Sequence, residues 1–151
     1  MRHLKQFALP LAGMLLAAGG ATAAKLDQVQ IKSSDKYGQY LTNGSGRPLY
    51  LFTKDGQGAG GSNPEVKCYD ACAAAWPPAT SASAPQASGE VSKDKLGTVK
   101  RKDGTMQVTY NGWPLYYFVK DKGAGAPAGQ DLHAQGGEWY LLKPDGSKVG
   151  H

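Results

Sequence analysis

The 151-residue sequence has only two cysteines and three histidines, and it lacks an Asp-x-Asp-x-Asp loop, a Gly-x-x-x-x-Gly-Lys loop and a Cys-x-x-Cys pair. These absences exclude the usual calcium loop, the phosphate-binding loop of nucleotide hydrolases and the thioredoxin-type redox motif. Hydrolases with a serine or cysteine nucleophile also need a histidine base. Apart from the terminal residue, His133 is the only histidine beyond the first 24 residues. We therefore expect a protein that is not an enzyme and carries no cofactor.

No apolar run in the sequence is long enough to cross a bilayer. The longest, from Phe7 to Ala18, contains proline and glycine, follows two basic residues and precedes a small-residue stretch that ends at Ala24. This pattern predicts a secretory signal peptide over 1–24 that is removed, leaving one domain of 25–151 with no transmembrane segment. No cysteine follows the cleavage site to carry a lipid. We expect a periplasmic or secreted protein.

A strong excess of one charge sign is also missing. Two of the 17 basic residues leave with the predicted signal peptide, so 15 remain against 12 acidic residues, a net charge of +3. The one basic run, Lys100-Arg101-Lys102, precedes an Asp-Gly turn and has no interleaved aromatic residues. It predicts a solvated strand end beside a turn, and we expect no nucleic acid as a partner.

What the sequence does contain is one ten-residue phrase written twice. GRPLYLFTKD at 46–55 and GWPLYYFVKD at 112–121 are identical at seven of ten positions. Turn signals precede both copies, with Asn-Gly pairs at 43–44 and 111–112, so each copy is predicted to be the second strand of a hairpin. A further Asp-Gly turn upstream of the second copy predicts a three-stranded meander over 98–118.

The repeat sets the expected architecture. Two pseudo-repeats, about 37–78 and 96–146, are joined by a Ser/Ala/Pro-rich loop at 79–90 that suits a flexible connection. Alanine-rich 66–76 predicts one short helix, which the prolines at 77 and 78 end. Both faces of the repeated strand are apolar, because side chains alternate with a period of two. We expect an all-β fold of two related hairpin or meander units, packed as a sandwich or barrel-like domain, with one short helix around the Cys-x-x-x-Cys segment.

The candidate site residues lie mainly in the repeated motif. They are Tyr50, Phe52, Asp55, Tyr116, Phe118 and Asp121, with Trp113 at the tip of the second hairpin. In a structural interpretation, the aromatic residues anchor packed hairpins and each aspartate accepts backbone N–H bonds from the loop that follows it. In a binding interpretation, the aspartates and tyrosine hydroxyls line a pseudo-symmetric pocket for a small ligand or a cation such as calcium. Trp113 is a candidate sugar platform, whereas Trp139 is expected in the core.

The two cysteines, Cys68 and Cys72, allow two interpretations. In an exported protein a disulfide is the default, and residues four apart on a helix have Cα atoms about 6 Å apart, a distance that a disulfide spans. The alternative is a soft-metal site, above all for copper, in which the two thiolates act with His133 or Met106.

Several segments, taken together, carry a resemblance to a known family. Both copies fit a Tyr-x-(Phe/Trp/Tyr)-x-x-Asp pattern, and with CYDACAAAWPP, DGTMQVTYNGWPLYYF and GGEWYLLKPDG the chain resembles the bacterial secreted-repeat family of predicted lipoproteins, from about Tyr37 to Gly146. The resemblance implies an exported protein without an established activity. Our leading hypothesis is a non-enzymatic envelope protein, a structural or binding scaffold for an unknown envelope component or small ligand. The alternative is periplasmic copper handling or redox work by Cys68 and Cys72.

Overall fold

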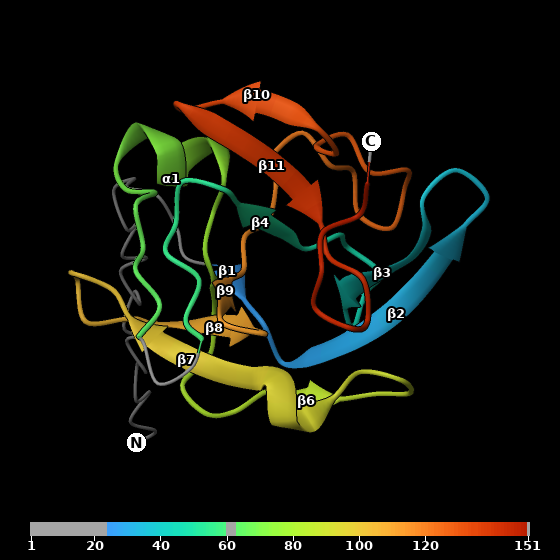
Figure 1. The fold of residues 1–151 in the computed structure, drawn as a ribbon, viewed down its shortest axis with the longest axis horizontal. Coiled ribbons are helices and arrows are strands. Elements are labelled where there is room, and N and C mark those ends of the chain that lie inside the picture. The colour runs from blue at the N-terminus through green and yellow to red at the C-terminus, as the bar shows by residue number, and fades with distance from the viewer. Residues whose placement is uncertain (1–23, 60–62, 151) are drawn as a thin grey trace, which may run out of the picture.

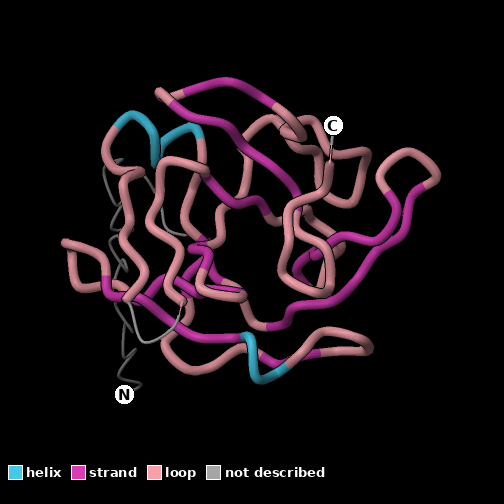
Figure 2. Tube along the Cα trace, in the orientation of Figure 1, coloured by secondary structure: helices cyan, strands magenta, loops and turns pink. Residues whose placement is uncertain are grey.

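The structure is a computed structural model that describes residues 24–59 and 63–150. Short strands joined by longer loops make up most of this part of the chain, as Figure 2 shows. The elements are β1 (Ala24–Lys25), β2 (Gln28–Ser34), β3 (Gly38–Asn43), β4 (Tyr50–Phe52), α1 (Ala71–Ala75), β5 (Ala79–Thr80), β6 (Gln86–Ala87), a 3₁₀ turn (Lys93–Lys95), β7 (Leu96–Lys100), β8 (Met106–Tyr110), β9 (Trp113–Pro114), β10 (Leu132–Ala134) and β11 (Gly137–Leu141).

The described strands form three sheets. One follows the order β1-β5-β8-β7 with β9 paired to β8, the second is β10-β11-β4, and the third is β3-β2-β6. In Figure 1 the β10–β11 pair lies at the top of the view and the β7–β8 pair at the bottom, with β4 between them. The predicted all-β fold with one short helix near the cysteines is confirmed, since α1 begins between the two cysteines and ends before Trp76.

The predicted hairpins, one in each repeat, form only at the beginning of each motif copy. In the second repeat, β8 and β9 form a hairpin whose turn residues Asn111 and Gly112 have φ of 51° and 78°. In the first repeat, Leu49 N–H still bonds to Leu41 in β3. Beyond this point the strand residues of both copies leave their own hairpin and bond to the other repeat, until each copy ends in a local turn at its aspartate.

This exchange between the repeats is mutual. Strand β4 of the first repeat pairs with β11 of the second, in a register that sets Phe52 opposite Trp139. In the other direction, Tyr117 N–H bonds to Pro77 oxygen at 2.8 Å and Val119 N–H bonds to Ala75 oxygen at 3.1 Å. Each motif is therefore held by the closing segment of the opposite repeat.

Side chains of the motif alternate between two core clusters, as the strand period requires. Leu51 and Tyr117 belong to one buried cluster, whereas Tyr50 and Phe118 belong to the other. The apolar prediction for both faces of the motif strand is confirmed. Because the strand is covered on each side, its polar atoms must find partners inside the protein.

The segment 79–90, expected as a flexible connection, includes β5 and β6. Strand β5 joins β1 to β8, and β6 pairs in parallel with β2. A small residue suits the start of this segment, because Ala79 is fully buried among larger core side chains.

Residues 1–23 of the predicted signal peptide lie outside the described residues, and its last residue, Ala24, begins β1. Among the residues that are described, no helix is long and apolar enough to cross a membrane.

Candidate functional site

The two motif copies meet in the interior, where each tyrosine hydroxyl bonds to the aspartate of the other copy. Tyr50 Oη donates to Asp121 Oδ2 at 2.8 Å, and Tyr116 Oη donates to Asp55 Oδ2 at 2.7 Å. Between these bonds the backbones of the two tyrosines exchange N–H···O bonds of 2.9 and 3.0 Å. The copies are thus related by a pseudo-twofold arrangement in which each one completes the polar contacts of the other.

The second oxygen of each aspartate binds the loop that follows it. Asp55 Oδ1 accepts the Lys67 N–H at 2.7 Å, and Asp121 Oδ1 accepts the Ala128 N–H at 2.7 Å. The predicted Asp-capped loops are confirmed, although the tyrosine partners across the repeat were not foreseen. The two carboxylates are only 5% and 8% exposed. Every carboxylate oxygen of the motif therefore has a partner from the protein itself.

Burial shifts the protonation of these groups. It raises the pKa of Asp55 to about 6, and the hydrogen bonds from Tyr116 and from the Lys67 backbone hold that pKa below what burial alone would give. Burial also raises the pKa of Asp121. For Tyr50 and Tyr116, burial and then the neighbouring carboxylate raise the pKa above its ordinary value. Both hydroxyls therefore remain protonated donors at neutral pH.

Beside the tyrosines, four aromatic rings form a continuous stack. The ring centroids are 4.1 Å apart for Phe52 and Trp139, 3.9 Å for Trp139 and Trp76, and 4.0 Å for Trp76 and Phe118. Each repeat supplies one phenylalanine from its motif and one tryptophan from its closing segment. Since all four are buried, they contribute most of their apolar area to the core. Trp139 lies in the core as predicted.

Glycine at the first motif position has a specific role at each crossing. Gly46 and Gly112 have φ of +85° and +78°, which L side chains rarely adopt. A Cβ on Gly112 would lie 1.7 Å from the Gly58 oxygen, and one on Gly46 would lie 3.0 Å from the Ala124 Cβ. Positions 58 and 124 are themselves equivalent in the repeat. The loop after each aspartate therefore crosses the hairpin turn of the opposite repeat.

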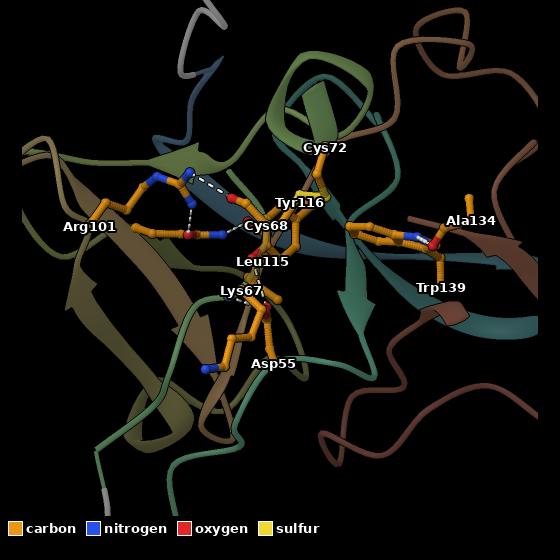
Figure 3. Close-up of a disulfide and its surroundings, with 10 residues drawn as sticks. Asp55, Lys67, Cys68, Cys72, Arg101, Leu115, Tyr116, Ala134 and Trp139 are labelled. Atoms are coloured by element: carbon orange, nitrogen blue, oxygen red, sulfur yellow. Dashed lines mark hydrogen bonds between the residues drawn. A yellow bond between two sulfur atoms is a disulfide. The ribbon is translucent and has the colours of Figure 1, made fainter. Parts of the chain in front are cut away.

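The two cysteines form a disulfide, with Cα atoms 5.2 Å apart (Figure 3). The disulfide prediction is confirmed. Both sulfurs are thereby taken, and His133 lies apart on the surface, 71% exposed and with Nδ1 3.7 Å from Glu138 Oε1. Within the described residues, no group of three or more His, Cys, Asp or Glu side chains is placed to hold a metal ion. Trp113 is half-buried and packs against the first core cluster.

The prediction of a wholly solvated basic run is wrong for Arg101, which is 5% exposed. Its Nη1 donates to Gln107 Oε1 at 2.7 Å and its Nη2 donates to the Cys68 oxygen at 2.8 Å (Figure 3). Arg101 directly follows β7, and the alternation of the strand continues past its end: Lys100 and Lys102 are exposed, whereas Arg101 between them points inward. The two-residue period of a strand could have indicated that Arg101 points inward, whereas the composition of the run could not.

Trp76 was absent from the candidate residues, although it lies at the centre of the aromatic stack. The signal in the sequence is its position: it follows Phe52 by 24 residues, and Trp139 follows Phe118 by 21. An alignment of the two repeats with a short gap would have paired the two tryptophans.

Comparison with known proteins gives one family match. The profile of a family described as a secreted repeat of unknown function matches residues 33–80 and again residues 97–143. Both matched ranges contain one copy of the motif. Comparison with curated proteins and with solved structures gives no match.

Proposed function

The chain belongs to this family of secreted repeats, and we propose that it is an exported, non-enzymatic protein of the cell envelope that acts as a rigid scaffold through its surface. One observation supports the proposal above the others. The tyrosine hydroxyls and aspartate carboxylates of the repeated motif, in both copies, are bonded to one another and to the protein's own loops.

A catalytic or ligand-binding motif holds polar groups ready for a molecule from outside. Here Tyr50 and Tyr116 are fully buried, and the Tyr116 hydroxyl donates to Asp55 inside the core. Buried groups with such partners make a fold rigid and specific. The motif therefore supports a framework, and contact with other molecules falls to the loops and exposed side chains.

Export and the oxidised state can be tested together on protein recovered from the periplasm and from the medium. We expect an intact mass that begins near Lys25, lacks the two hydrogens of the disulfide, shows no metal adduct and does not change with a thiol-blocking reagent. A sample that has been denatured and reduced must react with the reagent, which serves as the positive control.

Two results would overturn the proposal. The first is a reagent-reactive cysteine pair or a copper ion retained by the folded protein, because Cys68 and Cys72 would then be the working centre. The second is a substrate turnover that disappears in Tyr116→Phe while that variant stays as stable as the natural protein, because the motif would then act on a substrate.

A further inference from the structure

A polar groove lies on the surface beside the disulfide-linked segment. It runs between residues 64–69 and the end of β7, and its volume is about 360 Å³. Three of the residues that line it are lysines: Lys67, Lys100 and Lys102. The two lysines after Val99 are the exposed neighbours of Arg101, so the basic run presents its two ends to this groove.

The charges at the groove do not cancel. Lys67 Nζ pairs with Glu65, which also lines the groove, and these two charges offset each other. Lys100 and Lys102 take part in no ion pair with any other residue that the structure describes. The buried Arg101 between them donates hydrogen bonds only to neutral oxygens, and its charge is offset by the nearby carboxylates of Asp55 and Asp103. The positive potential of the groove therefore comes from Lys100 and Lys102.

One of these lysines contacts an aromatic ring. Lys102 Nζ lies 4.6 Å from the ring centroid of Tyr69, and the Arg101 guanidinium lies 4.5 Å from the same centroid. Tyr69 itself follows Cys68 directly, inside the loop that the disulfide closes. The disulfide thus places an aromatic ring that orients a cation at the groove, and less conformational entropy is lost when an anion binds.

From this arrangement we infer that the groove between Tyr69 and the end of β7 binds a phosphate group. The exposed donors are lysines, which act on an anion as point charges, whereas the planar fork of Arg101 is already used by Gln107 and Cys68. A tetrahedral phosphate anion, whose charge is shared by oxygens that point in several directions, suits such point charges better than a planar carboxylate, which favours a fork. The inference rests on the proposed function, since it gives the scaffold's surface a ligand.

The test uses the whole exported chain and two sources of phosphate. Inorganic phosphate is titrated by NMR, following the backbone amide of Tyr69, and vesicles of phosphatidylglycerol are compared with vesicles of phosphatidylcholine in a sedimentation assay. The variant Lys100→Gln/Lys102→Gln removes the two unpaired charges. The variant Lys120→Gln/Lys122→Gln makes the same change of charge at an exposed turn of the second repeat and is the control.

We expect saturable binding of at least one phosphate source, weakened about tenfold or more in the groove variant and less than about twofold in the control. Shifts with free phosphate would identify a soluble anion, and binding confined to phosphatidylglycerol would identify a headgroup; both support the inference. No binding to either probe, or equal losses in the two variants, would overturn it. That failure would leave the scaffold proposal standing, because export and the oxidised cysteines are measured separately.

Discussion

Replacing Tyr116 with phenylalanine removes one hydroxyl from the centre of the domain and keeps the ring. The lost bond is the 2.7 Å contact with Asp55, so the buried carboxylate retains only the Lys67 N–H among its hydrogen bonds. A hydrogen bond to a charged group contributes about 1.5–3 kcal/mol, and we expect the free energy of unfolding to fall by about 2 kcal/mol. Urea unfolding followed by tryptophan fluorescence measures it, because Trp139 lies edge-on to Tyr116 in the core.

The matched control is Tyr37→Phe, which deletes a hydroxyl from a half-buried ring and should change the free energy of unfolding by less than about 0.5 kcal/mol. Tyr50→Phe should cost at least as much as Tyr116→Phe, because Tyr50 Oη also accepts the Gly129 N–H, which would lose its acceptor. A double-mutant cycle between Tyr116→Phe and Asp55→Asn should show a coupling above about 0.5 kcal/mol. A Tyr116→Phe loss no larger than that of the control would refute the reciprocal bonding.

Three further predictions follow from the same contacts. The pKa of Asp55 in the folded protein, about 6, lies above its ordinary value of 3.8, so the protonated carboxyl stabilises the fold below about pH 4 and this stabilisation is lost as the pH rises through 6. The resulting change in the free energy of unfolding is about 3 kcal/mol at most. Asp55→Asn should remove most of this pH dependence in unfolding curves taken between pH 4 and 7. Gly112→Ala should lower the melting temperature far more than Gly104→Ala, since both have positive φ but only the first meets backbone within 4 Å; equal losses would show that strain alone acts. Fragments 24–90 and 91–150 should each lack the near-ultraviolet circular dichroism of a packed core and regain it when mixed, whereas a fragment that folds alone would contradict the exchange between repeats.

Local signals in the sequence were enough for some of the fold. The Asn111-Gly112 pair predicts its tight turn because both residues tolerate positive φ, and the structure places both there. The alternation of the motif predicts two buried faces for the same reason, since the side-chain period is a property of one strand. Composition predicts the disulfide once export is assumed. These features depend on residues close to one another in the chain.

The exchange between the repeats depends on contacts that no local pattern encodes. Phe52 and Trp139 stand opposite each other across 87 positions of chain, and the spacing of Tyr50 and Asp55 within one copy suggests nothing of a bond to the other copy. A repeat in a sequence shows that two units are alike. Whether they pack as separate units or complete each other is decided by backbone pairing across the whole domain.

The measurement that tests the central claim most directly is the detection by NMR of the hydroxyl protons of Tyr50 and Tyr116. The account predicts two slowly exchanging hydroxyl signals near neutral pH, each lost on substitution of the aspartate in the opposite repeat. The Tyr50 signal should also show a contact with the Gly129 amide, which donates to the same oxygen at 3.1 Å. Hydroxyl protons that exchange with water too fast to be seen, in a protein that is otherwise folded, would contradict it, because the motif would then be open to solvent and free to meet a ligand.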